Sequence, residues 1–241
     1  MLEIDHITFS YGNRRVLDSI TFDVAPGEIV ALVGLNGAGK TTLLNVLACL
    51  LMQDSGQVRL DDVDPLVRPL RYRKGIGFMP EACPLYSDMT VEAYLTYRVR
   101  LRGERSMRVR RRVSEAMNTC GLTEVSDERI SVLSLGYRKR LGVADALALH
   151  PKLLLLDDPI AGLDLPHRKK IAAALVSASA RSAVLVTGHE IAEMLTWCTR
   201  VVVLKEGCLN GLYRVSEYDQ KELHELLVQQ MMSDQTGEER S

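Results

Sequence analysis

The most constraining feature of the sequence is a glycine-rich stretch, residues 34–41, that reads Gly-Leu-Asn-Gly-Ala-Gly-Lys-Thr. It matches the pattern G-x-x-x-x-G-K-[S/T], in which glycines let backbone N–H groups surround a chain of phosphates. The apolar run 28–33 predicts a buried strand before it, and residues 41–53 predict a helix after it. This strand–loop–helix context favours a phosphate-binding loop (P-loop) over a plain glycine turn.

Two residues of this loop carry the expected chemistry. Lys40 adds a point charge for the outer phosphates, and the start of the following helix adds the positive end of its dipole. Thr41 is expected to supply an oxygen to Mg²⁺. Further along, the leucines 153–156 predict a strand that delivers Asp157 and Asp158 at its carboxyl end, where open α/β sheets bind ligands. Such a run is also common in purely structural settings, but beside a P-loop it favours Asp157 as a Mg²⁺ ligand.

The remaining pattern alternates strands and helices. Short strands are predicted at 4–10 and 20–24, near the start, and look antiparallel. Apolar runs at 76–79, 184–187 and 201–204, with helical patterns at 167–180 and 190–196, predict a mostly parallel sheet covered on both faces. A helix-friendly, Arg-rich stretch at 91–118 lies within an expected helical insertion, 82–150.

The sequence after residue 210 predicts a tail helix. A capping pattern, Ser216-x-x-Asp219, precedes Leu223, Leu226, Leu227 and Met231 on one helical face, so a helix from about 219 to 231 is expected, with a frayed polar end. Packing on its own domain is favoured over pairing two copies of the chain.

Composition excludes several functional classes. Thirty Lys and Arg balance 31 Asp and Glu, so the net charge of −1 provides no field for nucleic acid, and no nucleic-acid partner is expected. No uncharged apolar stretch reaches the roughly 18–20 residues that span a bilayer. The acidic start does not resemble a signal peptide, which predicts a cytoplasmic protein. Five scattered cysteines without a C-x-x-C pair suggest neither disulfides nor a zinc site.

The order of motifs resembles that of an ATP-binding cassette (ABC) ATPase over nearly the whole chain. Residues 133–137 (Leu-Ser-Leu-Gly-Tyr) are similar to the family's LSGGQ signature, and residues 161–164 to its D-loop. The other motifs, in chain order, are an aromatic at Tyr11, a Walker A loop at 34–42, Glu81 at the Q-loop position, Walker B acids at Asp157 and Asp158, and a switch histidine at His189.

The resemblance implies a fold and a set of sites. The fold class is α/β: a P-loop NTPase core with a mostly parallel sheet, an antiparallel β subdomain and an inserted α-helical subdomain. One domain then covers 1–241, with the core at 1–81 and 151–210, the helical signature subdomain at 82–150 and the tail at 211–241. The cofactors are ATP and Mg²⁺. The residues expected to bind nucleotide are Tyr11, Gly34, Leu35, Asn36, Gly37, Ala38, Gly39, Lys40, Thr41, Thr42, Ser134 and Gly136.

The remaining implied roles are catalytic and metal-binding. Asp158, His189 and Glu81 are expected to act in catalysis, and Thr41, Asp157 and Glu81 to hold Mg²⁺. In the family, two cassettes face each other head to tail, and the signature of one closes over the nucleotide of the other, which is the role implied for Ser134. Simpler interpretations remain open: a plain helix cap at Ser134, a core histidine at His189 and turn packing at Tyr11.

Four positions depart from the family pattern. Asp158 stands where a glutamate usually polarises water; a side chain shorter by one methylene retracts the carboxylate by about 1.5 Å, which predicts slow hydrolysis. In the signature, Leu135 replaces the first glycine and Tyr137 the glutamine, although Gly136 preserves the close backbone approach. Glu81 at the Q-loop position is common in the branch paired with ABC-2 type export permeases.

The favoured function is therefore the ATP-hydrolysing subunit that powers a separate transmembrane permease, an exporter, by ATP-driven closure of two cassettes, homo- or heterodimeric. Such a subunit sits on the inner face of the cell membrane through its permease. The alternatives are a soluble ABC ATPase without a transport role, and an ATP-dependent clamp that hydrolyses slowly because of Asp158.

Eight arginines lie between residues 98 and 112, against Glu104 alone. Helical spacing places Arg98, Arg102 and Arg105 on one face. A solvated helix face is the favoured interpretation, and contact with a membrane partner or with anionic headgroups is the alternative.

Overall fold

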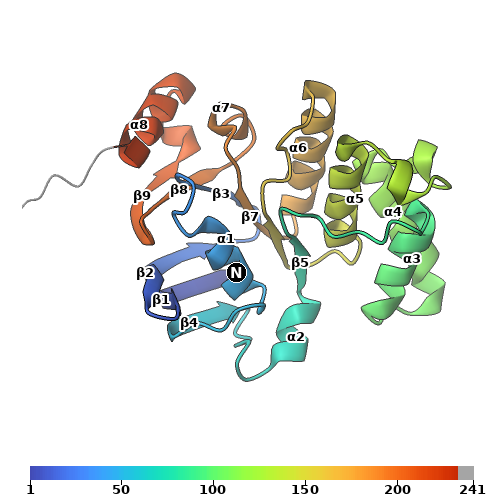
Figure 1. Cartoon of the computed structure of the whole chain (residues 1–241), viewed down its shortest axis with the longest axis horizontal. Helices are drawn as coiled ribbons and strands as arrows, with labels where there is room; N and C mark the ends of the chain where they lie inside the picture. Colours follow the sequence, from blue (N-terminus) through green and yellow to red (C-terminus); the bar gives the residue numbers. More distant parts are fainter. Residues whose placement is uncertain (233–241) are drawn as a thin grey trace, which may run out of the picture.

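Two sheets organise the chain in the computed structural model, which describes residues 1–232 (Figure 1). The larger sheet has six strands in the order β5-β6-β7-β3-β8-β9. Neighbouring strands are parallel from β5 to β8, and β9 runs antiparallel to β8. Their bounds are Ile29–Val33 for β3, Ile76–Met79 for β5, Leu153–Leu156 for β6, Ala183–Thr187 for β7, Arg200–Lys205 for β8 and Cys208–Arg214 for β9.

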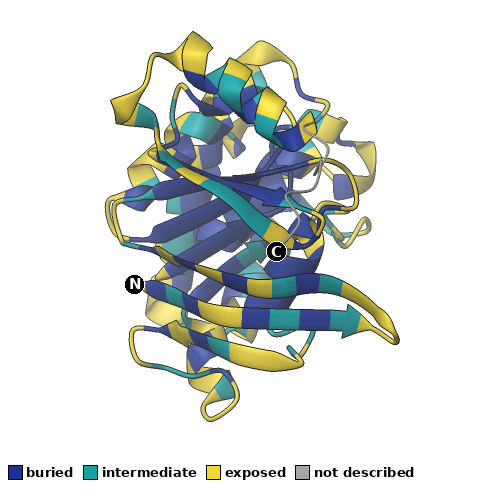
Figure 2. Cartoon of the chain, turned by 90° about the vertical axis from the view of Figure 1, so that its left-hand side faces the viewer, coloured by how far each residue is buried: buried dark blue, intermediate teal, exposed yellow. Residues whose placement is uncertain are grey.

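Burial on both faces explains why β3 has a continuous apolar sequence. All five residues of β3 are buried, but they belong to two different cores. Val30 and Leu32 face a core shared with helix α1 (Lys40–Leu47) and the smaller sheet, whereas Ile29, Ala31 and Val33 face the other helices. The parallel strands of this sheet are buried along most of their length in Figure 2, whereas the edge strand β9 is half-buried or exposed. The sheet is thus the partition between two hydrophobic cores.

The smaller sheet is antiparallel, with the order β2-β1-β4. Its strands are β1 (Leu2–Tyr11), β2 (Arg14–Val24) and β4 (Ser55–Leu60). Alternate residues such as Leu2, Ile4 and Phe22 are buried, which is the pattern of a sheet with one solvated face. The predicted pair of antiparallel strands is confirmed, and β4 is an addition that the sequence did not indicate.

The helical subdomain contains α3 (Val91–Leu101), α4 (Ser106–Cys120) and α5 (Leu135–Leu147), at one end of the molecule (Figure 1). The expected helical stretch at 91–118 is present, divided between α3 and α4. The chain turns between α3 and α4, where Gly103 adopts a φ of 85° that an L-residue rarely takes. Two 3₁₀ turns, η1 (Thr123–Val125) and η2 (Ile130–Val132), lead into α5.

The break also corrects the predicted arginine face. Arg102 caps the end of α3 and Arg105 precedes α4, so these two do not share a helix face with Arg98. Arg98 Nη2 lies 2.9 Å from Asp145 Oδ2, and Arg102 donates to the carbonyl oxygen of Ile76. Arg112 pairs with Glu104 at 3.4 Å. The other five arginines of the stretch are exposed: Arg100, Arg105, Arg108, Arg110 and Arg111. Neither predicted interpretation therefore covers all eight side chains.

The remaining helices are α2 (Pro69–Lys74), α6 (Leu165–Ser179), α7 (Ile191–Met194) and α8 (Gln220–Met232), with a 3₁₀ turn η3 (Val215–Glu217). Among them, α6 packs on the central strands β3 and β7, and α8 packs on β8. Helix α1 ends at Leu47, earlier than the predicted residue 53, because the chain turns at Cys49 with a φ of 57°. Within residues 1–232, no helix combines the length and apolar character needed to cross a bilayer.

The tail helix is present as α8, and its apolar face lies on its own chain. Leu223, Leu227 and Met231 are buried in the core that contains β8 residues such as Val201. Residues 211–214 of the expected tail belong instead to β9. The predicted frayed end beyond residue 232 lies outside the described residues.

Candidate functional site

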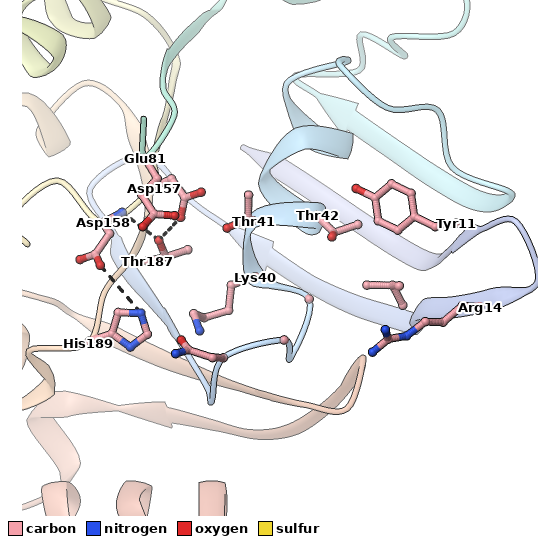
Figure 3. A pocket seen from close by; sticks show the side chains of 14 residues that line it. Tyr11, Arg14, Lys40, Thr41, Thr42, Glu81, Asp157, Asp158, Thr187 and His189 are labelled. Carbon is pink, nitrogen blue, oxygen red and sulfur yellow. Dashed lines mark hydrogen bonds and ion pairs between the residues drawn. The ribbon is translucent and has the colours of Figure 1, made fainter. Parts of the chain in front are cut away.

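A cavity of about 490 Å³ opens at the carboxyl ends of β3, β6 and β7 (Figure 3). The P-loop forms its floor. In Figure 3, Tyr11 and Arg14 stand on one side of Lys40 and Thr41, and the acids and His189 stand on the other. The lining residues are Tyr11, Arg14, Val16, Asn36, Gly37, Gly39, Lys40, Thr41, Thr42, Glu81, Asp157, Asp158, Thr187 and His189.

The P-loop needs glycine at two positions for reasons of space. A Cβ at Gly34 would lie 2.2 Å from the carbonyl oxygen of Leu204, on the neighbouring strand β8. Gly39 has a φ of 105°, and its Cβ would lie 2.9 Å from the carbonyl oxygen of Val16. Gly39 also precedes the first residue of α1. The loop can therefore enter the helix tightly, with the first N–H groups of α1 directed toward the cavity.

The Lys40 side chain folds back onto the P-loop. It is buried, and Nζ donates to the carbonyl oxygens of Gly34 at 2.7 Å and Leu35 at 3.0 Å. Burial lowers the pKa of the Lys40 ammonium, and the charges of Asp157, Asp158 and Glu81 oppose this effect. Exchange of two carbonyl acceptors for phosphate oxygens would give the ammonium stronger, charge-assisted hydrogen bonds.

Thr187, at the end of β7, connects the two acids that follow β6. Its hydroxyl donates to Asp157 Oδ1 at 2.6 Å and accepts from the Asp158 backbone N–H at 3.0 Å (Figure 3). Because the hydroxyl hydrogen points to Asp157, its lone pairs remain for the N–H of Asp158. One hydroxyl thereby fixes both acids relative to the sheet.

Asp158 has an unusual backbone and a poorly satisfied carboxylate. Its φ is 48°, in the left-handed region. The side chain is buried, Oδ2 lies 3.8 Å from His189 Nε2, and Oδ1 has no hydrogen-bond partner within residues 1–232. Burial raises the pKa of the Asp158 carboxyl, whereas His189 and Lys139 lower it. A buried carboxylate oxygen without a hydrogen-bond partner is rare in folded proteins and calls for an explanation in strain or in chemistry.

The donor set fits Mg²⁺. The residues expected to hold the metal, Thr41, Asp157 and Glu81, all line the cavity, and each offers oxygen. No group of three or more His, Cys, Asp or Glu side chains within residues 1–232 forms a protein-only metal cage. Mg²⁺ generally takes one or two carboxylates and completes its shell with water and substrate phosphates, so a full cage is not required.

Most of the predicted site residues come together in this cavity, but five do not line it. Gly34 lies behind the loop, and Leu35 and Ala38 line a separate depression beside Lys205. Ser134 and Gly136 lie at the start of α5, outside the cavity wall. The structure thus assigns the P-loop, the acids and His189 to one pocket and the signature residues to another surface.

Ser134 is the N-cap residue of α5. Its Oγ accepts a hydrogen bond from the backbone N–H of Tyr137 at 3.4 Å. A Cβ at Gly136 would lie 3.5 Å from the ring of His167, so the first turn of α5 packs against the start of α6. The Tyr137 and His167 rings meet edge to face, with centroids 6.0 Å apart.

Sequence reasoning missed Arg14, Val16 and Thr187 as lining residues. Thr187 had a detectable signal, since it ends a predicted strand immediately before Gly188 and His189. Arg14 and Val16 had none, because they reach the cavity through the hairpin of β1 and β2, whose register brings Tyr11 opposite Arg14.

Comparison with known proteins gives one consistent family. The ABC transporter family model matches residues 17–161. The chain is 34% identical to the uncharacterized ABC transporter ATP-binding protein YxlF of Bacillus subtilis, over 92% of this chain and 74% of that protein. It is 39% identical to the sulfate/thiosulfate import ATP-binding protein CysA of Methylococcus capsulatus, over 90% of this chain and 64% of CysA.

Two further comparisons concern an exporter and a solved structure. The chain is 34% identical to the lipopolysaccharide export system ATP-binding protein LptB of Escherichia coli K12, over 86% of this chain and 88% of LptB. The dimeric structure of MJ0796, a bacterial ABC transporter cassette, superposes with a TM-score of 0.81 and 24% identity, over 89% of this chain and 99% of that chain. This structural likeness concerns the fold.

Proposed function

Because the chain belongs to the ABC transporter family and is an ATPase of that family, we propose that it powers a membrane permease that is a separate polypeptide. The observation that carries the proposal is the single cavity that joins the P-loop with Glu81, Asp157, Asp158 and His189. That set contains phosphate-binding, metal-binding and water-orienting groups, which are the parts required for phosphoryl transfer to water.

The residues divide the work by position. Lys40 and the N–H groups of the P-loop and of the first turn of α1 bind the phosphates. The ring of Tyr11, 52% exposed at the far side of the cavity, offers a surface for the adenine base. Mg²⁺, held by Thr41, Asp157 and Glu81, would neutralise phosphate charge when bound. Asp158 then orients and polarises the attacking water, and His189, whose Nε2 lies 3.8 Å from Asp158 Oδ2, would contact the terminal phosphate.

We also propose that a second cassette completes the site. Ser134 and Gly136 lie outside the cavity of their own chain, and the first N–H groups of α5 have no partner within the helix, as at any helix N-terminus. In a head-to-tail dimer, the N-terminus of α5 would close over the nucleotide of the partner. MJ0796, whose fold this chain shares, is described as a dimer.

Export is the proposed direction, and Glu81 at the Q-loop position is the residue that supports it. LptB is an export subunit, whereas CysA is an import subunit, so the relatives represent both directions. The proposed location is the inner face of the membrane, in contact with the permease. A permease partner predicts that the tagged chain copurifies with a polytopic membrane protein; copurification with soluble proteins alone would support the non-transport alternative.

ATP turnover against protein concentration tests the enzymatic proposal directly. We expect the rate per chain to rise with concentration, because two chains form each complete site, and Lys40→Ala to abolish turnover. A rate per chain that is independent of concentration, with the chain monomeric throughout, would contradict the composite site. Turnover by Lys40→Ala equal to that of the wild type would contradict the assignment of the cavity.

A slow clamp is the second candidate function, because Asp158 replaces a longer acid. It predicts that the unmutated chain forms stable dimers in ATP and Mg²⁺ that outlast many minutes. Size-exclusion chromatography in ATP separates the two: persistent dimers with negligible turnover favour the clamp, and rapid return to monomers favours the transport motor.

A further inference from the structure

Lys139, on helix α5, reaches from the helical subdomain to the backbone behind the catalytic cavity. Only 6% of its surface is exposed. Its Nζ donates to the backbone carbonyl oxygen of Asp158 at 2.8 Å and to that of Glu81 at 3.5 Å. The Lys139 ammonium therefore joins α5 to the backbone of Asp158 and to the loop that follows β5.

Space filling does not account for a lysine at this position. A methionine has a similar length, fits irregular cores and needs no hydrogen-bond partner, whereas a buried ammonium is costly unless its protons are paired. The two acceptors are carbonyls of the residues that the proposed function places at the attacking water and at the metal. The ammonium thus acts on the backbone of the site without lining the cavity.

The backbone of Asp158 is fixed on both sides by side chains. Thr187 accepts its N–H at 3.0 Å, and Lys139 donates to its carbonyl at 2.8 Å. Between these two contacts the residue holds a φ of 48°. A non-glycine residue stays in that conformation only where its surroundings impose it, so the two contacts determine where the carboxylate points.

The loop after Glu81 is seated on α5 through a second contact. Cys83 Sγ donates to the carbonyl oxygen of Arg138 at 3.5 Å, and a Cβ at Gly142 would lie 2.4 Å from the same sulfur. Half-buried Cys83 therefore reports whether this loop remains on α5. Because the sulfur packs against Gly142 of α5, a detached loop would expose the thiol to reagents in solution.

We propose that Lys139 is a positioning residue, which ties the backbone of Asp158 and the loop after Glu81 to helix α5 and makes ATP hydrolysis depend on the seating of that helix. This inference rests on the proposed function and goes beyond it. Any movement of the helical subdomain relative to the sheet would pull on the Asp158 carbonyl directly, so a permease that shifts α5 would switch hydrolysis without touching the nucleotide.

Steady-state kinetics of Lys139→Met, with Lys139→Arg and Lys169→Met alongside, test this assignment. Lys169 is an exposed lysine of α6 and gives the matched control. For Lys139→Met we expect kcat to fall by about tenfold or more, with KM and ATP affinity within about threefold of wild type, because misplacement of about 1 Å affects the chemical step more than binding. Lys139→Arg keeps the charge and the donors and should recover much of kcat.

The alkylation rate of Cys83, followed by peptide mass spectrometry in the absence of ATP, gives a readout independent of activity. We expect it to rise several-fold in Lys139→Met and to stay at the wild-type value in Lys169→Met. An unchanged kcat, or a wild-type alkylation rate in Lys139→Met, would overturn the inference. Wild-type protein without any ATP turnover would instead refute the proposed function, and the alkylation rate alone would then decide whether Lys139 tethers the loop.

Discussion

At the residue scale, the single hydroxyl of Thr187 positions the two acids at the carboxyl end of β6. Thr187 is buried at the end of β7. Its hydroxyl donates a hydrogen bond to the carboxylate of Asp157 and accepts one from the N–H of Asp158. Both partners are themselves buried. Buried polar groups that lose a partner keep the full cost of their desolvation.

Thr187→Val removes this hydroxyl at nearly constant volume. We expect the free energy of unfolding to fall by about 1–3 kcal/mol, because two buried polar groups lose their partner, and ATP turnover to fall with it. Urea denaturation and steady-state turnover measure the two effects. Thr187→Ser, which keeps the oxygen, is the control and should retain most of the activity; equal behaviour of Val and Ser would show that the hydroxyl is dispensable.

Asp158→Glu tests the consequence of the short acid. Extending the side chain by one methylene would move the carboxylate by about 1.5 Å toward the attacking water, and we expect ATP turnover to rise by about tenfold or more. Turnover of the two proteins under identical Mg²⁺ conditions checks this. Equal rates would mean that the left-handed backbone at residue 158 already compensates for the shorter side chain.

Asp158 also predicts a dependence of stability on pH. Burial raises the pKa of its carboxyl in the folded state, with only partial compensation by His189 and Lys139. A carboxyl whose pKa is higher when folded destabilises the fold wherever it is ionised, and this penalty disappears as the pH falls through its folded pKa. We therefore expect Asp158→Asn to have a higher Tm than wild type at pH 7.

The effect of Asp158→Asn on Tm should depend on pH. The gain in Tm should shrink as the pH falls toward 4, near the ordinary pKa of an aspartate. Asp127→Asn, at an exposed residue, should show no such change. A gain in Tm that is independent of pH would show that the charge of Asp158 is not its source.

At the element scale, prediction succeeded where a segment is buried on both faces or has a strong motif. The four leucines of β6 were predicted with their observed ends, and the core strands β3, β5, β7 and β8 within a residue or so. Their continuous apolar runs leave little freedom. By contrast, β4 (Ser-Gly-Gln-Val-Arg-Leu) and β9 have mixed sequences, and their pairing with β1 and β8 comes from tertiary contacts that composition does not encode.

The candidate site was predictable to a similar degree. The P-loop, Asp157 and Asp158 carry strong local motifs, and the structure places most of them around one cavity. Arg14 and Val16 reach it through hairpin register, and Lys139 through the packing of α5 on the sheet. Such long-range placements have no local sequence signal.

The arginines of the helical subdomain allow a matched prediction at this scale. Arg98 pairs with Asp145, which is buried and also accepts from the hydroxyl of Tyr94 at 3.3 Å. Arg98→Met would leave Asp145 buried without its cation, and we expect a loss of about 2–3 kcal/mol in the free energy of unfolding. Arg100→Met, on the exposed face of the same helix, should change stability little. Equal urea midpoints for both variants would show that the pair contributes nothing.

At the scale of the whole molecule, the cavity lies where the two hydrophobic cores meet. Helix α1 and the antiparallel sheet belong to one core, and α5 and α6 belong to the other. The P-loop leads into α1, which belongs to the first core. Lys139 belongs to α5 of the second core and donates to the carbonyl oxygen of Asp158. In the proposed function, the nucleotide-binding loop and the catalytic acid are thus supported by different halves of the fold, and hydrolysis depends on the relative position of the two cores.

The position of Ser134 outside its own cavity has a genetic consequence. In the proposed dimer, Lys40→Ala and Ser134→Arg each spoil both sites when the variant is alone. A mixed pair concentrates both defects in one site and leaves the other intact. With random pairing in an equal mixture, half of the dimers are mixed and half of their sites work, so about a quarter of wild-type turnover should return. Two inactive alleles would then complement each other, and lack of any recovery after subunit exchange would contradict the shared site.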